Sequence, residues 1–152
     1  MNPETQNPLP VFAGTVNRVV DESHRITVPA SWRHPDLSEL YAMPDPRQPS
    51  LVLMVAGEME KIRVAVESDP SIPRLEARAF VRQLYAAARP CAMDRQGRLV
   101  LPAEECGRLG LSGEVVIVGG GSRIEIWTQE EWAKVAERER SVLTEIADRI
   151  GF

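Results

Sequence analysis

The spacing of apolar and polar residues predicts short paired strands near the start of the chain. Residues 14–20 (GTVNRVV) are rich in β-branched side chains and predict a strand, and residues 25–28 predict the return strand after a polar turn. Residues 29–33 predict a short helix with Pro29 in its first turn, and residues 34–49 a proline-rich loop. The chain therefore opens with a hairpin and a short helix.

The next stretch predicts a second hairpin and a longer helix. Two apolar runs, LVLMVA (51–56) and KIRVAV (61–66), stand on either side of Gly57 and are typical of two paired strands. Residues 73–88 contain no helix breaker after Pro73, and they predict a helix. The apolar side chains of this helix are Leu75, Ala79, Phe80, Leu84 and Tyr85.

The second half of the chain repeats this order of elements. Residues 90–101 predict a hairpin, and residues 102–110 a short helix with Gly110 near its C-terminal end. Residues 114–127 predict another hairpin whose turn contains three glycines. Each half is thus expected to contain two strands, a short helix, two strands and a long helix.

The last helix is expected to begin at a capping box. Thr128 is the predicted N-cap, and the side chain of Glu131 is expected to reach back to it. An apolar stripe follows at steps of three, four or seven residues, although Glu139 interrupts it. The stripe consists of Trp132, Ala136, Leu143, Ile146 and Ile150.

A motif at the tip of the first hairpin recurs in the second half of the chain. Both copies read D-x-x-x-R, then three small or apolar residues, then P-A. The pairs Asp21 and Asp94, Arg25 and Arg98, and Pro29 and Pro102 each stand 73 positions apart. Neither half is expected to fold alone, because a four-stranded half with one covered face exposes too much apolar surface.

The motif combines a residue that shapes a turn with a cation. An aspartate at the start of a turn accepts backbone N–H groups that follow it, and Gly97 can adopt a positive φ at little cost. His24 stands at the matching position of the first tip and belongs to the residue types that tolerate positive φ. For one copy, a tight turn with a surface ion pair is a sufficient interpretation. Two copies with matching flanks favour a functional pair.

The charge of the chain is unevenly distributed. The net charge of −4 over 152 residues argues against indiscriminate binding of polyanions. Residues 82–98 nevertheless carry four arginines against one aspartate, a local charge of +3. Acidic residues gather in the last helix and its approach, namely Glu125, Glu130, Glu131, Glu137, Glu139, Glu145 and Asp148.

No pattern in the sequence indicates an enzyme, a metal site or a cofactor. The glycines of VGGGSR join two predicted strands, so a hairpin turn explains them better than a phosphate-binding loop does. The spacing of Cys91, Cys106, His24 and His34 supports none of the usual ligand pairs, and reduced, partly buried cysteines are expected. Residues 1–10 predict a disordered arm without the order of a signal peptide, and no membrane span is expected.

The double D-x-x-x-R hairpin occurs together with the segments EARAFVRQLYAAA, DRQGRLVLPAE and RIEIWTQEEW. Through these features the chain resembles the MraZ family of bacterial transcription factors from about Val11 to Ile150. The resemblance implies an α+β fold, a duplicated AbrB/SpoVT-like swapped-hairpin β-barrel with flanking helices. Its first repeat would span residues 11–88 and its second residues 89–152, interlocked as one globular unit. It also implies ring-shaped homo-oligomers in the cytoplasm, associated with the nucleoid.

The same resemblance implies a repressor of the division and cell-wall gene cluster. Its partner would be double-stranded DNA of its own promoter region, bound at G-rich direct repeats. Carried over by position, Arg25 and Arg98 would contact DNA, and Arg18 and Arg95 are weaker candidates. The turn-shaping residues would be Asp21, Asp94, Gly97 and His24. The first tip departs from the family pattern, because Ser23 and His24 replace a lysine and a glycine.

An alternative is a protein–protein module, such as an antitoxin-like barrel with no direct role in DNA binding. Its acidic final helix would then dock a partner. The competing interpretation of that helix is a solvated acidic face whose stripe around Trp132 packs on the barrel. A gel shift with the DNA upstream of the protein's own gene separates these alternatives.

Overall fold

The computed structural model describes residues 9–152, so the predicted arm of residues 1–10 lies almost wholly outside the described residues. The strands are β1 (Phe12–Val20), β2 (Arg25–Thr27), β3 (Glu39–Pro44), β4 (Leu51–Met54), β5 (Arg89–Ala92), β6 (Arg98–Val100), β7 (Gly113–Gly121) and β8 (Arg123–Thr128). The helices are the 3-10 turn η2 (Ala30–Trp32), α1 (Ala56–Ser68), α2 (Arg74–Ala87), α3 (Ala103–Leu109), α4 (Gln129–Arg138) and α5 (Val142–Ile150).

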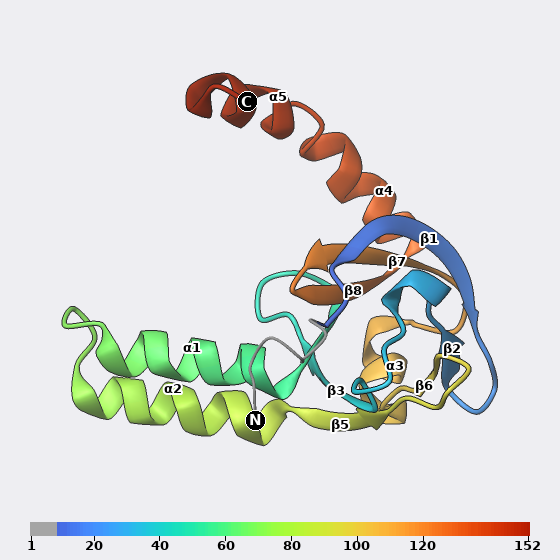
Figure 1. Cartoon of the computed structure of the whole chain (residues 1–152), viewed down its shortest axis with the longest axis horizontal. Coiled ribbons are helices and arrows are strands. Elements are labelled where there is room, and N and C mark those ends of the chain that lie inside the picture. The colour runs from blue at the N-terminus through green and yellow to red at the C-terminus, as the bar shows by residue number, and fades with distance from the viewer. Residues whose placement is uncertain (1–8) are drawn as a thin grey trace.

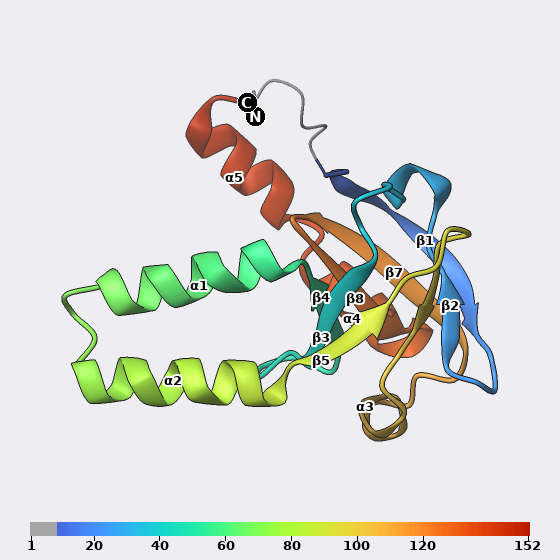
Figure 2. The same cartoon turned by 60° about the horizontal axis from the view of Figure 1, so that its bottom comes forward.

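These elements form an α+β fold, as predicted (Figure 1). A six-stranded sheet has the strand order β1-β7-β8-β4-β3-β5, and β2 and β6 form a separate two-stranded ribbon. All the strand pairs are antiparallel. The pair α1–α2 projects from one side of the sheets, while the loops before β2 and β6 lie on the other side (Figures 1 and 2). Among residues 9–152, no helix has the length and apolar character that crossing a bilayer requires.

The order of elements is the same on either side of Ala88. Two strands, a short helix, two strands and two helices occur in each half. Most strands pair across the halves rather than within the predicted hairpins: β1 pairs with β7, β5 with β3, β2 with β6 and β4 with β8. Between β5 and β6 there is only the bridge from Met93 to Leu99 within the described residues. In the predicted hairpins of residues 14–28 and 90–101 the chain does reverse its direction. The two strands of each hairpin, however, do not pair with each other, so this part of the prediction is wrong.

The predicted hairpin of LVLMVA and KIRVAV is wrong in its second strand. Residues 51–54 form β4, but Ala56–Ser68 is the helix α1. Along β4 the side chains alternate: Leu53 faces the main core, whereas Val52 and Met54 pack with Met59 of α1 and Leu84 of α2. A strand buried on both faces needs a covering element, and this packing overrides the β-branched character of residues 61–66.

The predicted proline-rich loop contains a strand. Residues 39–44 form β3, which lies between β4 and β5. Its side chains Leu40 and Ala42 are fully buried and alternate with more exposed neighbours. The turn residues of the segment hid this alternation, because prolines surround it and one ends the strand.

The helices before and after the second hairpin match the sequence more closely. The helix predicted over residues 73–88 is α2, although Leu75, Phe80 and Tyr85 are exposed. The short helix predicted over residues 102–110 is α3, and Gly110 caps it with a φ of 69°. The hairpin predicted over residues 114–127 is β7–β8.

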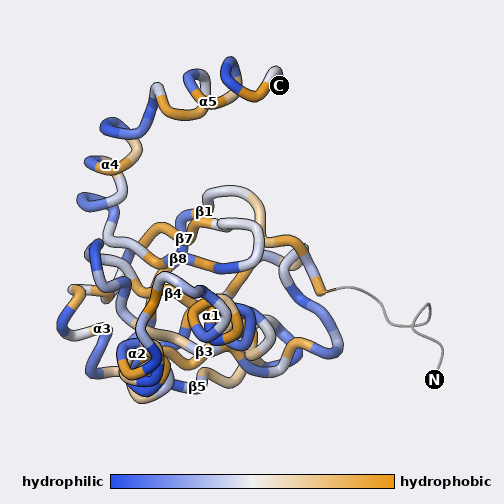
Figure 3. The backbone as a smooth tube through the Cα atoms, turned by 90° about the vertical axis from the view of Figure 1, so that its left-hand side faces the viewer, coloured by the Kyte–Doolittle hydropathy of each residue, from blue (hydrophilic) through white to orange (hydrophobic). Residues whose placement is uncertain are grey.

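The predicted final helix is two helices. Thr128 caps α4, because its Oγ1 accepts the backbone N–H of Glu131 at 3.1 Å, but the Glu131 carboxylate lies near Lys134. This helix ends at Arg138, with Glu139 as its C-cap, and α5 starts in a new direction (Figure 1). Figure 3 shows apolar and polar residues alternating along α5, which extends away from the sheets.

Candidate nucleic-acid interface

The two repeated arginines lie on one face of the β2–β6 ribbon. Ile26 and Leu99 face each other at its centre and are 1% and 0% exposed. Because side chains alternate along a strand, Arg25 and Arg98 project from the opposite, solvent-facing side. Arg25 pairs with Val100, so Arg25 and Arg98 are diagonal neighbours across the ribbon. The Cα atoms of such a diagonal pair lie roughly 7–8 Å apart.

The second tip is a tight turn organised by Asp94. Its Oδ1 accepts the backbone N–H groups of Gln96 and Arg98, both at 2.9 Å, and its Oδ2 accepts Arg98 Nε at 2.7 Å. The backbone closes the turn from Gly97 N to Asp94 O at 3.0 Å. One carboxylate therefore shapes the turn and aims the guanidinium.

The first tip has the same bonds at the matching positions. Asp21 Oδ1 accepts the N–H groups of Ser23 and Arg25, and Oδ2 accepts Arg25 Nε at 3.2 Å. His24 has a φ of 60° where Gly97 has 78°, so the histidine adopts the backbone conformation that the turn requires. The proposed turn-shaping residues thus occupy equivalent positions in both tips.

Each tip is bound to the opposite half of the chain through that positive-φ residue. Val28 N donates to Gly97 O at 2.9 Å, and Leu101 N donates to His24 O at 2.8 Å. Val28 and Leu101 are again 73 positions apart and both are buried. These reciprocal bonds fix each turn to the strand that follows the other turn.

The aspartate–arginine ion pairs of the two tips are exposed, and their aspartates are ionised at neutral pH. The backbone N–H of Arg25 is the main cause that lowers the pKa of Asp21, and that of Arg98 has the same effect on the pKa of Asp94. Both carboxylates therefore stay ionised beside their arginines. The Arg25 and Arg98 side chains are 46% and 48% exposed, so their outer edges remain open to a ligand.

The two tips differ in how firmly they hold the arginine. Arg98 Nη2 also donates to Gln96 Oε1 at 2.8 Å. The matching residue in the first tip is Ser23, which donates its backbone N–H to Asp21. Arg98 is therefore the more restrained of the two guanidinium groups.

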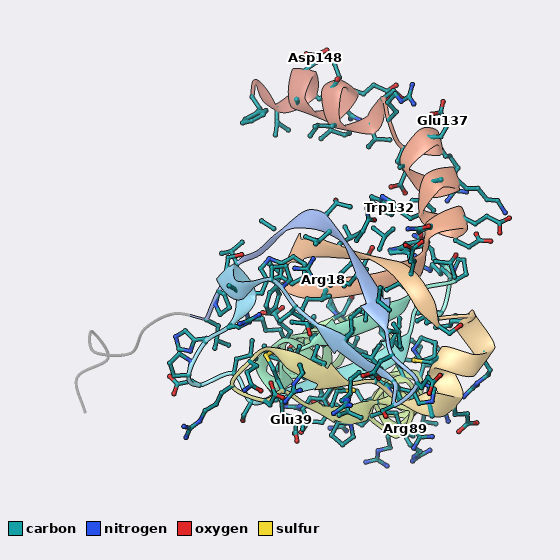
Figure 4. All side chains as sticks on the ribbon, turned by 90° about the vertical axis from the view of Figure 1, so that its right-hand side faces the viewer. Arg18, Glu39, Arg89, Trp132, Glu137 and Asp148 are labelled. Carbon is teal, nitrogen blue, oxygen red and sulfur yellow. The ribbon has the colours of Figure 1, made fainter. Side chains whose placement is uncertain are left out.

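The weaker candidates take different positions. Arg18 lies on β1 rather than at a tip (Figure 4), and its Nε donates to the carbonyl of Thr27 at 2.9 Å. This side chain therefore connects β1 to the end of β2. Arg95 stands in the second tip and is exposed. Arg89, which contributes to the local positive charge of the sequence, pairs with the buried carboxylate of Glu105 at 3.3 Å.

Arg33 is a further basic residue of this region that the sequence did not single out. It follows Trp32, which is buried and donates Nε1–H to Ala13 O, so Arg33 is held just outside the core. Its side chain lies against Gly97 of the second tip, from the other half of the chain. The sequence gives no signal for this contact, because the two residues are far apart along the chain.

The cysteines and histidines form no metal centre in the described part of the chain. Among residues 9–152, no three His, Cys, Asp or Glu residues gather as a metal site would require. Cys91 and Cys106 are free and buried, as predicted for reduced cysteines. Burial raises the pKa of each thiol to about 11, which keeps both in the neutral form.

The C-terminal helices behave differently from each other. The rings of Trp127 and Trp132 lie 5.8 Å apart, and Val135 is buried, so α4 packs on the sheet as one interpretation predicted (Figure 4). The stripe on α5 is uncovered instead, with Leu143 and Ile150 76% and 74% exposed.

The chain is similar to one family along most of its length. The family model described as "MraZ protein, putative antitoxin-like" matches residues 84–151. The "Transcriptional regulator MraZ" of Carboxydothermus hydrogenoformans is 33% identical over 140 residues, which cover 92% of this chain and 96% of that protein. The protein of the same name from Heliobacterium modesticaldum is 30% identical over the same shares of both chains. That from Symbiobacterium thermophilum is 32% identical over 91% of this chain and 99% of its own.

Proposed function

The chain belongs to the MraZ family, and we propose that it is a transcriptional regulator that binds double-stranded DNA through the β2–β6 ribbon. The observation that carries this proposal is the placement of Arg25 and Arg98 on the outer face of one ribbon, each oriented by an aspartate. A two-stranded ribbon fits the major groove of B-DNA, and arginine is the residue that most often contacts guanine there.

Both arginines keep enough donors for such a contact. An arginine has five N–H donors. In Arg98, one hydrogen on Nε and one on Nη2 are used by Asp94 and Gln96. The hydrogens on Nη1 and the second on Nη2 remain, and two parallel N–H groups match the O6 and N7 atoms of guanine. In Arg25 only Nε is used by its own turn.

The family supports the more specific parts of the proposal. We take the target to be G-rich direct repeats in the protein's own promoter region, upstream of the division and cell-wall genes, and the effect to be repression. The protein would act in the cytoplasm at the nucleoid, without a cofactor or catalytic activity. The reciprocal bonds at His24 and Gly97 support a duplicated AbrB/SpoVT-like swapped-hairpin barrel, with repeats at residues 11–88 and 89–152.

We also propose that the protein forms a cyclic homo-oligomer. The exposed stripe of α5 needs a covering surface, and an apolar groove of about 550 Å³ between α2 and β3–β4 can provide it. The groove is lined by Met43, Val52, Met54, Ile62, Phe80 and Leu84, with Arg123 at its side. Stripe and groove are different surfaces of one chain, so α5 of one copy in the groove of the next gives a head-to-tail contact, the type of contact from which rings are built when the rotation between neighbours closes.

Fluorescence anisotropy with duplex DNA from upstream of the protein's own gene tests the DNA-binding function. The competitor is a shuffled duplex of the same composition, and both are titrated at several salt concentrations. We expect tighter binding to the native duplex and a steep fall with salt, with a slope of about −0.9 per neutralised phosphate on log axes. The double variant R25A/R98A should lose the preference, whereas R47A, which alters an exposed arginine in the loop between β3 and β4, should not.

The alternative function is an antitoxin-like protein–protein module, and the exposed stripe of α5 is the observation that favours it. Under that alternative, R25A/R98A would bind DNA as wild type does, and neither protein would prefer the native duplex to the shuffled one. That result would exclude the ribbon as the DNA-binding surface.

A further inference from the structure

A groove of about 750 Å³ runs beside the second tip and is formed by both halves of the chain. Arg33, His34 and Ser38 line it from the segment after η2, and Asp94 and Arg95 line it from the tip. Two guanidinium groups from separate parts of the sequence thus border one open depression. Among residues 9–152, neither Arg33 nor Arg95 forms an ion pair with a carboxylate.

Arg33 is held in this position by its surroundings. Its Nη2 donates to Val28 O at 3.3 Å, and Val28 N in turn donates to Gly97 O. A methyl group on residue 97 would collide with the Nε and Cδ atoms of Arg33, so the absence of a side chain at Gly97 lets the guanidinium lie against the tip. The glycine therefore serves both the turn and the placement of Arg33.

The first tip has no such pair of cations. The residue 73 positions after Arg33 is Cys106, which is buried, and the residue 73 positions before Arg95 is Glu22. A thiol and a carboxylate thus stand where the second tip has two arginines. The pair of arginines that borders the groove therefore has no counterpart at the matching positions of the first tip.

We propose that Arg33 and Arg95 bind a phosphate of the DNA backbone in this groove, next to the base that Arg98 contacts. This inference rests on the proposed DNA-binding function. The N–H donors of an arginine that has no carboxylate partner match the geometry of a phosphate group. Contacts to the DNA backbone fix the register in which an adjacent side chain meets its base. Arg33 would therefore position the second tip on the DNA without distinguishing between sequences.

The test compares R33A, R33K, R95A and R98A with the control R47A, using the full chain. Binding to the native duplex and to one with its guanines replaced is measured against salt. R33A and R95A should weaken binding to both duplexes by the same factor, and each should reduce the salt slope by up to about 0.9, the value for the one phosphate that they share. R33K should keep the slope because it keeps the charge. R98A should lower the preference for the native duplex.

Duplexes with one uncharged methylphosphonate linkage locate the contact. At one position this linkage should weaken binding to wild type, and it should weaken binding to R33A by a smaller factor because only Arg95 still contacts that phosphate. If R33A and R95A keep the wild-type slope while R98A loses sequence preference, the groove is not a phosphate site although the proposed function stands. If the double variant R25A/R98A also binds as wild type does, the proposed function itself fails. Circular dichroism is the check that each variant is folded. If R33A is unfolded, R95A provides the test, because Arg95 lies at an exposed tip.

Discussion

Ile26 and Leu99 lie directly opposite each other at the centre of the β2–β6 ribbon, and both side chains are buried in the core. This pair determines where the arginines point. A slip of one residue in either strand would bring an arginine into the core, so burial of the pair strongly fixes the register. The same contact therefore holds the two halves together and presents Arg25 and Arg98 on one surface.

Leu99→Ala should test the structural part of this relationship. We expect the free energy of unfolding to fall by about 2–5 kcal/mol, because a fully buried leucine is replaced by a cavity. Urea unfolding followed by circular dichroism measures the change. Val100→Ala, at an exposed position of the same strand, is the matched control and should change it by less than about 0.5 kcal/mol.

The two tips should contribute unequally to DNA binding. Arg98→Ala should cost about 1–3 kcal/mol of binding free energy and reduce discrimination at one guanine. Arg25→Ala should cost less, because Arg25 lacks the second tether that Gln96 gives to Arg98. Anisotropy titrations with single-base variants of the duplex provide the measurement. A larger loss for Arg25→Ala would contradict the order expected from the two tethers.

Substitutions at the matching positions 24 and 97 should have opposite effects. His24→Gly should raise the free energy of unfolding by up to about 1 kcal/mol, because glycine adopts the φ of 60° with less strain. Gly97→Ala should lower it by about 1–2 kcal/mol, because alanine at a φ of 78° is strained. Gly97→Ala also displaces Arg33, so its DNA affinity should fall as in R33A. Equal effects of the two substitutions on unfolding would argue against equivalent turns.

The head-to-tail contact predicts a complementation between two oligomer-breaking variants. Leu143→Glu alters the stripe and Phe80→Glu alters the groove, and each alone should be monomeric. Mixed together, they retain one intact stripe and one intact groove, so a dimer of the two variants should form. Light scattering after size exclusion measures the masses. Phe80→Leu, which keeps the groove apolar, is the control and should still assemble.

A mixture that stays monomeric, or single variants that keep the wild-type mass, would contradict this contact. Both residues are exposed in the single chain, so neither substitution should unfold it.

The buried thiols should react slowly and make stability fall at alkaline pH. A thiol pKa of about 11 in the fold exceeds the value of about 8.5 for an unfolded cysteine. Unfolding therefore releases protons between these values, and the free energy of unfolding should fall as the pH rises through that range. Labelling with a thiol reagent at pH 8 should be slow in the native protein and rapid in urea. Rapid native labelling would mean that Cys91 and Cys106 are accessible.

Local patterns of residues were enough to predict the turns, the middle helices and one hairpin. The repeat of Asp21 and Arg25 at Asp94 and Arg98 specified both turns, since an aspartate and a residue able to adopt positive φ are enough to close them. The helices α2 and α3 and the β7–β8 hairpin followed from periodicity, from Gly110 and from the glycine-rich turn.

The pairing of the strands, and the exposure of the arginine side chains that results from it, depend on long-range packing. No local pattern indicates that β2 pairs with β6, because each strand has three residues and its partner lies in the other half of the chain. Residues 61–66 favour a strand by propensity, but the outer face of β4 needed a cover and α1 provides it. Long-range packing also places Arg33 against Gly97, a residue of the other half of the chain. It thereby brings together the residues that we propose bind the DNA backbone.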